Sequence, residues 1–392
     1  MTTKSEYDLH TVLFSNYSSD IRPVNDEKAK LTINVTAFLT SIVGLDEPSG
    51  QLVTTMAFVF TWIDIGLLWS PDDYDGRTNI YVDFRRIWTP PIFLLNPSQS
   101  LQRLGNEGGK TPVRHDGLVT WSVGGIMHST CHVDVTYFPF DEQKCLIKFN
   151  AFEYEFLIEY QILQSSMNML LFTENGVWQV EKTEVTTYQY TIICTLYLKR
   201  RSTFYQLNII TPIMILVFLN SMVFLLPAES GERVGFAVTI LLSVSVYMTI
   251  IADSLPSTSK PVSILNYVLI FFLTQSAVIC IKTIIGIRMY AKADLRTTST
   301  FLHGIVKLFK SGSLVRVCED RKVHIDNDTK DGSEKKAMGI DCKTTQDEND
   351  RNAITWTLVA EAFDRLSLCV NLILTIVVVV AFIVVIVRGT KH

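Results

Sequence analysis

The stretch from Glu232 to Asp253, ERVGFAVTILLSVSVYMTIIAD, decides how the rest of the chain is organised. It is long enough to cross a bilayer as a single helix. It also carries more hydroxyl groups than a helix that faces only lipid needs. Taking every third or fourth residue collects side chains that share one helical face. That face consists of Glu232, Gly235, Thr239, Leu242, Val246, Ile250 and Asp253.

This face is acidic at both ends, small or hydroxylated near its start and apolar in the middle. Phe236, Ile240 and Tyr247 make the opposite side bulky. Several copies of such a helix around an axis would form a pore with acidic rings at its mouths and an apolar constriction between them. The alternative is a buried membrane helix whose Ser and Thr hydroxyls bond to its own backbone. This helix alone leaves both interpretations open.

The composition divides the chain into a soluble half and a membrane half. Its 392 residues are 48% hydrophobic with a formal net charge of -4, which does not suit a nucleic-acid partner. Four dense apolar runs lie after residue 206, at 207–226, 232–253, 262–287 and 366–387. No metal-ligand cluster or nucleophile–base arrangement is evident, so the sequence predicts neither an enzyme nor a cofactor.

Residues 1–206 have the pattern of an all-β domain after a short helix at Tyr7–Phe14. Period-two alternation and turn residues predict strands at 30–40, 52–62, 79–82, 118–122, 132–136, 146–152 and 187–198. That many short strands in one domain favours a β-sandwich.

The charge distribution gives the membrane topology. Residues 288–365 carry Lys and Arg close to the helix ends, as at Arg288, Lys292 and Arg296, which favours the cytoplasm. Four spans then place the soluble domain and the tail at 388–392 outside the cell. Within the cytoplasmic segment we expect an amphipathic helix at 301–309 and partial disorder at 319–350. The segment 353–364 permits a helix that continues into the fourth span.

The cysteines and sequons agree with an extracellular soluble half. Of seven cysteines, only Cys131 and Cys145 lie close together in that half, which indicates one disulfide. Asn16 and Asn34 begin glycosylation sequons. No secretory signal opens the chain, so we expect that one was removed and that Met1 begins a mature or expressed form.

The loop between the two cysteines carries a resemblance to a known family. Residues 131–145, CHVDVTYFPFDEQKC, closely resemble the signature of the Cys-loop receptors, the pentameric ligand-gated ion channels. Four further segments resemble nicotinic acetylcholine receptor subunits, and the resemblance suggests an invertebrate member. They are YSSDIRPV (17–24), WIDIGLLWSP (62–71), IWTP (87–90) and LPSTS (255–259). The resemblance implies an extracellular β-sandwich over four transmembrane helices, the second of which lines a pore in a ring of five subunits. It also implies a plasma-membrane location, with a synapse as one candidate setting.

The family's agonist site is a box of aromatic rings between neighbouring subunits, which holds a cationic amine. The resemblance assigns Trp62 to the complementary face. Leu95 and Phe152 replace the family's Tyr and Trp, and the third loop keeps Tyr188 and Tyr190 without adjacent cysteines. Phe is a weaker cation–π partner than Trp, and Leu is none, so we expect a weak or absent response to acetylcholine. Alternatively, Leu95 and Phe152 pack in the sandwich core and Tyr188 is an ordinary strand aromatic.

The resemblance also predicts the residues that couple ligand binding to the pore. They are Asp46 and Glu47 in the first sandwich loop, Phe138, Pro139, Phe140 and Asp141 in the Cys loop, Arg201 before the first span, and Leu255–Ser257, including Pro256, after the pore helix. The family's ion pair matches Glu47 with Arg201. The alternative is an inert surface pair.

The pore face predicts how ions are selected. A ring of Glu232 at the cytoplasmic mouth would attract cations, and Asp253 would form a wider outer ring. Leu242 and Val246 would form a dewetting gate. Arg233 follows Glu232 directly, but one helical step turns it about 100° away from the axis. Gly235 replaces the family's usual hydroxyl at the narrowest level.

Two functions from different classes remain after this reading. The first is a cation-selective, ligand-gated channel subunit with four further subunits, a cationic-amine agonist, monovalent cations and membrane lipids as partners. The second is a non-conducting, accessory binding subunit that needs other subunits. The depleted aromatic box supports the second, and the intact pore face supports the first.

Overall fold

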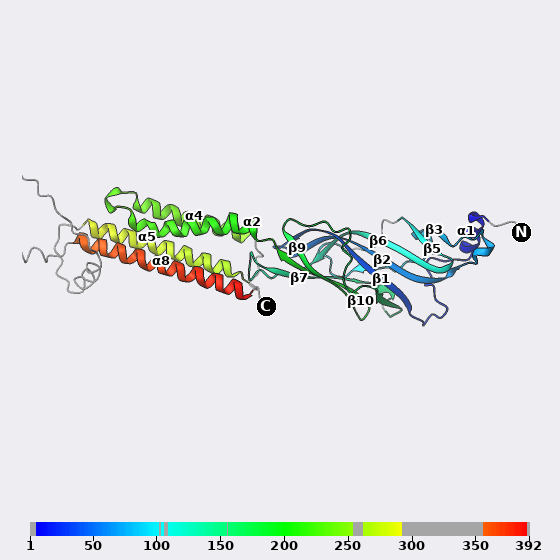
Figure 1. The fold of residues 1–392 in the computed structure, drawn as a ribbon. Helices are drawn as coiled ribbons and strands as arrows, with labels where there is room; N and C mark the ends of the chain where they lie inside the picture. The colour runs from blue at the N-terminus through cyan, green and yellow to red at the C-terminus, as the bar shows by residue number, and fades with distance from the viewer. Residues whose placement is uncertain are drawn as a thin grey trace, which may run out of the picture. The chain divides into compact units, whose positions relative to one another are not determined.

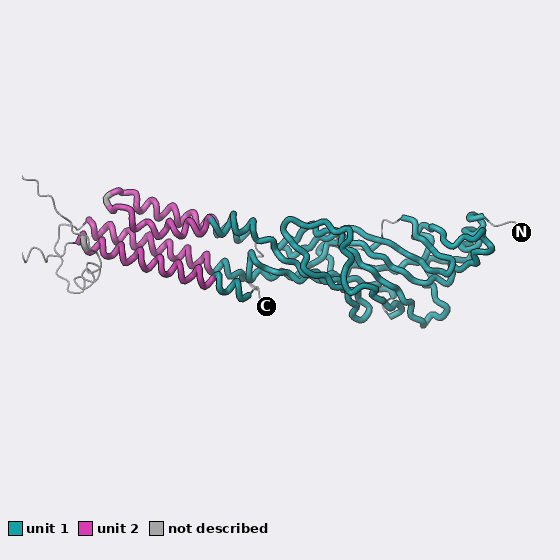
Figure 2. Tube along the Cα trace, viewed as in Figure 1, with its two compact units in different colours: residues 1–211, 248–267, 383–392 teal, residues 212–247, 268–382 magenta. Residues whose placement is uncertain are grey.

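The computed structural model describes residues 5–101, 103–105, 109–154, 156–253, 262–291 and 356–389. The chain divides into two compact units (Figure 2). One unit contains Met1–Thr211, Met248–Tyr267 and Ile383–His392, and the other contains Pro212–Tyr247 and Val268–Phe382. The predicted features at Pro256, 301–309 and 319–350 lie outside the described residues.

The β-rich part of the first unit is built from two sheets (Figure 1). The six-stranded sheet has the order β3 (Asn79–Asp83), β5 (Lys110–Arg114), β6 (Asp116–Thr130), β2 (Gln51–Leu68), β1 (Leu31–Asp46) and β8 (Ile158–Ile162). The four-stranded sheet has the order β4 (Phe93–Leu94), β7 (Glu142–Asn150), β10 (Thr191–Arg200) and β9 (Trp178–Tyr188).

The core of this sandwich follows from the period-two alternation along each strand. In β2 every second residue from Leu52 to Trp62 is buried, because alternate side chains point to opposite faces of a sheet. Phe58 of β2 and Phe149 of β7 meet edge to face across the two sheets, with ring centroids 4.8 Å apart. The predicted β-sandwich is therefore confirmed.

Short helical segments complete this part of the fold. Helix α1 (Glu6–Phe14) begins with a capping box in which Ser5 and Asp8 satisfy each other's backbone amides. Three 3-10 turns follow at η1 (Pro71–Asp73), η2 (Phe84–Arg86) and η3 (Phe152–Tyr154).

Two predicted strands differ from the structure. Residues 132–136 form a loop, because the Gln143 side chain bonds the backbone of Asp134 and so replaces a ladder partner. The strand predicted at 187–198 is confirmed over 191–198, which belong to β10, but the chain turns at 189–190, where Gln189 adopts a left-handed φ of 54°, and 187–188 end β9. The sequence did not predict β4, β5 and β8, which are two to five residues long, or most of the longer strand β9.

Four helices in the described parts of the chain are long and apolar enough to cross a membrane. The first covers Thr203–Leu225 and combines α2 (Thr203–Tyr205), a π-helical segment η4 (Gln206–Ile210), α3 (Thr211–Met222) and a 3-10 turn η5 (Val223–Leu225). After η6 (Ala228–Ser230) come α4 (Arg233–Asp253), α5 (Ile264–Tyr290) and α8 (Trp356–Gly389). Helix α8 runs without a break through the segment before the fourth apolar run.

Candidate functional sites: pore face, coupling cluster and ligand face

Helix α4 exposes one continuous stripe of side chains. Leu242, Val246 and Ile250 are 61%, 58% and 50% exposed, and Gly235, Thr239 and Asp253 are exposed on the same face. The buried face carries other positions, which are Ala237, Ile240, Val244 and Ile251. Within the part of the chain that the structure describes, the exposed stripe is thus the same one that the spacing groups together. Glu232 is also exposed, but the helix begins one residue later, at Arg233.

The hydroxyl groups of α4 are satisfied within the helix. Thr239 donates to the carbonyl of Gly235 at 2.8 Å, and Ser243 donates to the carbonyl of Thr239 at 2.9 Å. Ser245 makes the same bond to Leu241. These bonds remove the cost of placing a hydroxyl in an apolar setting, so they are compatible with both interpretations of the helix. The exposed apolar stripe is what separates this helix from one that is buried all round.

Arg233 at the start of α4 points into the protein interior. Its side chain is fully buried, and its Nη2 lies 2.8 Å from Oδ1 of Asp364 in α8. Its Nε donates to the carbonyl of Val223 at 3.2 Å, and the guanidinium lies over the ring of Phe224. Arg233 and Glu232 are therefore neighbours in sequence with opposite environments. The sequence analysis did not identify Asp364 as a partner of Arg233. An acidic residue near the start of an apolar run does indicate a buried ion pair, because charges in a membrane segment need a partner.

Arg200, at the end of β10, is the centre of a buried charge cluster. Its Nη1 lies 2.7 Å from Glu47 and its Nε donates to Asp141 at 2.7 Å. The guanidinium also lies among three aromatic rings: Trp178 at 4.3 Å, Phe138 at 5.0 Å and Tyr205 at 5.2 Å from the ring centroids.

The charge state of this arginine is fixed by its surroundings. Burial by itself lowers the pKa of the Arg200 guanidinium, but the hydrogen bond and charge of Asp141 and the charge of Glu47 outweigh burial and raise the pKa overall. Arg200 is therefore a permanent cation inside the fold. A buried cation of this kind needs both carboxylates, since the interior cannot solvate it.

The expected partner of Glu47 was Arg201, and this assignment is wrong. Arg201 is exposed and pairs with Glu174 at 2.6 Å. Side chains alternate along β10, where Ile192, Cys194, Leu196 and Leu198 are buried, so position 200 points inward and position 201 points outward. Asp46 is likewise exposed, and its carboxylate accepts a hydrogen bond from Ser49.

The Cys loop lies against two helix starts within the same unit. The disulfide Cys131–Cys145 closes the loop, as predicted. Phe138 and Pro139 are buried and Phe140 is half-buried. Phe138 packs edge to face on Tyr205 in α2 at 5.2 Å, and Ile264, the first residue of α5, donates its N–H to the carbonyl of Thr136 at 3.0 Å. Movement of this loop would therefore bear directly on both helices.

The predicted complementary aromatic, Trp62, is not at a surface. It is 1% exposed and packs edge to face against Trp88, with ring centroids 5.7 Å apart. Trp62 lies in the set of alternate β2 residues whose side chains point into the core, whereas Ala57 and Val59 lie in the set that points outward. These two residues help to line a surface cavity of about 360 Å³ together with Thr40, Ser122 and Leu171. Trp62 is therefore corrected to a core residue.

The other predicted ligand residues fall into separate groups. Phe152 is 51% exposed and lies beside Phe93, with centroids 5.9 Å apart, so it does not pack in the core. Leu95 is half-buried. Tyr188 is 67% exposed. The described ring contacts do not join these residues into one box.

Tyr190 belongs to a different surface feature. Its ring packs on Phe156 at 5.2 Å, and the ammonium of Lys30 lies 5.7 Å from its centroid. These three residues help to line a cavity of about 550 Å³ that also includes Glu159 and Gln189.

The two sequons differ in their structural setting. Asn16 is exposed just beyond α1. Asn34 is half-buried inside β1, opposite Thr61 of β2 and Gln161 of β8.

Comparison with known proteins gives two matches to family profiles. Residues 6–209 match the neurotransmitter-gated ion-channel ligand binding domain. Residues 209–308 match the neurotransmitter-gated ion-channel transmembrane region.

Curated relatives are neuronal acetylcholine receptor subunits. The chain is 32% identical to subunit alpha-3 of Bos taurus over 294 residues, which covers 71% of this chain and 59% of that subunit. It is 28% identical to subunit alpha-5 of Homo sapiens over 403 residues, which covers 95% of this chain and 85% of that subunit. The match to subunit alpha-6 of Gallus gallus is 31% over 353 residues, 85% of this chain and 70% of that subunit. The match thus spans 59% of the alpha-3 subunit.

Proposed function

Because the chain belongs to the neurotransmitter-gated ion channels, as a nicotinic-like member of the Cys-loop receptors, we propose that it is a subunit of a cation-selective channel. Five such subunits, identical or related, surround one pore in the plasma membrane. A ligand bound between neighbouring extracellular domains opens it, and monovalent cations pass.

The observation that carries this proposal is the uncovered stripe of α4. Among the described residues, Leu242 and Val246 are 61% and 58% exposed in the middle of a membrane helix whose other side is buried. In a ring this face lines the lumen, and the apolar residues make a constriction that excludes water when it is narrow. The side with Ala237, Ile240 and Val244 packs against the same subunit.

Cation preference comes from the different environments of two neighbouring residues, the exposed Glu232 and the buried Arg233. Glu232 is exposed at one end of the stripe, and five copies would form a ring whose fields add inside low-dielectric walls. Arg233 has the opposite charge and follows directly, but its guanidinium is held by Asp364 in the interior. The ring therefore keeps its negative potential. Asp253, at the wider outer mouth, is screened better and contributes less.

The coupling cluster supports gating by a ligand. Arg200 ties the β1–β2 loop at Glu47 to the Cys loop at Asp141, and its Nη1 donates to the hydroxyl of Tyr205 in the first membrane helix at 3.2 Å. A ligand opens the channel only if it binds the open arrangement better than the closed one. A rigid, buried charge cluster at this junction transmits such a difference because its members cannot move independently.

The agonist is proposed to be a cationic amine other than acetylcholine. Phe152, Tyr188 and Tyr190 remain as surface aromatics able to hold a cation on their faces. The surface positions of β2 carry Ala57 and Val59 rather than a ring, and Leu95 contributes none. The aromatic contribution to a quaternary ammonium is thus smaller on both faces, which lowers the affinity for acetylcholine.

The test is electrical and needs an open pore. The full chain, expressed in oocytes, is opened either by an amine found in a ligand screen or by Leu242→Thr, which makes the apolar constriction polar. Reversal potentials are measured while external sodium chloride is diluted. We expect sodium to carry the current, and Glu232→Ala to reduce cation preference or conductance more than Asp253→Ala. A wild-type current carried by chloride contradicts the proposal.

A second function is favoured by one observation, the reduced aromatic box. In that case the chain is an accessory subunit that does not conduct alone. The discriminating experiment is expression of the chain by itself with Leu242→Thr. Surface-labelled protein that carries no current alone, but changes the current of a co-expressed nicotinic subunit, supports the accessory role.

A further inference from the structure

Three consecutive residues of the Cys loop contact three different membrane helices. The carbonyl of Thr136 accepts an N–H from the start of α5, and the Phe138 ring packs on α2. Between these two residues, the Tyr137 ring lies directly against Gly389, the last residue of α8. This end of α8, from Ile383 onward, belongs to the same compact unit as the sandwich. The contact of Tyr137 with α8 adds a third helix to the coupling site described above.

The contact requires glycine at residue 389 because the ring and the helix backbone lie so close together. A Cβ on this residue would come within 2.7 Å of Cδ1 of Tyr137 and closer still to Cε1 and Cζ. Carbon atoms that are not bonded normally approach to about 3.5–4.0 Å, so even alanine would displace the ring or the end of the helix. Tyr137 and Gly389 are both half-buried. The ring therefore occupies the space that a side chain at residue 389 would fill.

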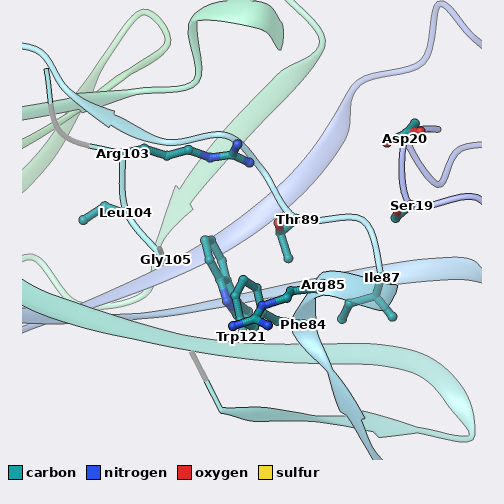
Figure 3. A pocket seen from close by; sticks show the side chains of 10 residues that line it. All are labelled: Ser19, Asp20, Phe84, Arg85, Ile87, Thr89, Arg103, Leu104, Gly105 and Trp121. Atoms are coloured by element: carbon teal, nitrogen blue, oxygen red, sulfur yellow. The ribbon is translucent and has the colours of Figure 1, made fainter. Parts of the chain in front are cut away.

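The backbone conformation of Gly389 does not by itself require glycine. Glycine often follows the end of a helix because it adopts a left-handed φ without strain. Gly105 has such a conformation: Figure 3 shows it beside Trp121 in the lining of a separate cavity, and its φ is +86°. Gly389, in contrast, is not among the described glycines with a positive φ, and it lies within α8. Space for the Tyr137 ring is therefore the structural reason for glycine here.

The contact lies where an otherwise exposed helix becomes covered. Most apolar side chains of α8 between Ile373 and Val385 are exposed among the described residues, as in a helix that faces lipid. Ile386 is buried and Gly389 is half-buried, and residues three apart share one helical face. Val387, on another face, is exposed. One face of the last turn of α8 is therefore packed, and Tyr137 covers that face at Gly389.

The Cys loop can transmit a displacement of Tyr137 because hydrogen bonds brace it from within. The buried side chain of Gln143 donates to the carbonyl of Asp134 at 2.8 Å and to the carboxylate of Asp141 at 2.6 Å. Asp141 is in turn the buried partner of Arg200. The disulfide joins the two ends of the loop. A shift at the end of α8 therefore reaches the coupling cluster through a connected network.

We propose that the Tyr137–Gly389 contact positions the Cys loop on the fourth membrane helix and so couples the end of α8 to the opening of the pore. Both are positioning residues, which act through the contacts of the Cys loop with α2 and α5. This inference rests on the proposed channel function, since coupling requires a pore that opens. A disturbance at the end of α8 then changes how often the pore opens, and leaves the conductance of the open pore unchanged.

The test is a double-substitution cycle on single channels, because the open probability of one channel is independent of how much protein reaches the surface. Leu242→Thr opens the full chain without an agonist, and every variant is recorded in that background. Gly389→Ala should change the open probability by about fivefold or more, a usual size for coupling between sites. Tyr137→Ala removes the ring, so adding Gly389→Ala to it should change the open probability by less than about twofold.

Val387→Ala is the matched control, since it shortens an exposed side chain in the same turn of α8. We expect it to leave the open probability unchanged. An unchanged open probability in Gly389→Ala, an equal change in Val387→Ala, or additive effects in the cycle would each overturn this inference and leave the channel function standing. If no chain bearing Leu242→Thr carries current, the channel function fails and this inference fails with it.

A second measurement tests the contact without any current. In a full chain that carries Tyr137→Cys and Gly389→Cys, mild oxidation should join the two residues, because their side chains would start close together. Mass spectrometry of unreduced peptides should find this link, and should not find one when Tyr137→Cys is combined with Val387→Cys. Absence of the first link in protein that keeps the Cys131–Cys145 disulfide would overturn the contact.

Discussion

Replacement of Asp141 by Asn should damage the sandwich far more than loss of an ordinary surface charge. Asp141 is 1% exposed, and Arg200, its partner at 2.7 Å, is fully buried. The substitution keeps the shape of the side chain and its capacity to accept one hydrogen bond. It removes the negative charge and so leaves Arg200 as a buried cation with a single remaining carboxylate, Glu47.

The magnitude follows from burial. Removing one partner of a buried ion pair costs about 3–5 kcal/mol, because the other charge is left without solvent or counterion. Glu47 still lies 2.7 Å from Arg200, but its side chain is 17% exposed and its charge is better screened. We therefore expect the low end, about 3 kcal/mol. For a unit of this size that corresponds to a fall in Tm of about 6–12 °C.

The assay is thermal unfolding of the purified full chain, followed by the signal of its buried tryptophans. Glu174→Gln is the control, since it removes the carboxylate that pairs with Arg201, the neighbouring arginine, at the surface. Exposed pairs contribute little, so this variant should unfold almost as the wild type does. Equal shifts for Asp141→Asn and Glu174→Gln would refute the assignment of Arg200 as the buried centre.

Three further results are expected. Cys131→Ser with Cys145→Ser opens a short loop and should lower stability by about 3 kcal/mol, as measured by denaturant unfolding with and without reductant; no difference would contradict a structural disulfide. Asp364→Asn should free the Arg233 charge beside Glu232 and reduce cation preference, and adding Arg233→Gln should restore it; unchanged reversal potentials in the single variant would reject this role. Low-micromolar acetylcholine should evoke little current, so a robust response would show that the reduced aromatic box still suffices.

Features that depend only on neighbours along the chain can be predicted from the amino-acid sequence alone. A helical period places Leu242, Val246 and Ile250 on one face of α4 whatever surrounds it, because residues three and four apart share a face. Period-two alternation likewise identified long strands such as β1 and β2, and hydropathy identified the membrane spans. These patterns are local, so they can be read before any contact is known.

Contacts between side chains far apart in the sequence depend on the tertiary structure. Arg200 rather than Arg201 reaches Glu47, because the register of β10 sets which of the two points inward. Trp62 belongs to the core because it is one of the alternate β2 residues whose side chains point inward. Arg233 finds Asp364 only when α4 and α8 pack together. Such pairings depend on strand register and helix packing, and a one-residue shift reverses a strand's faces, so local composition leaves them open.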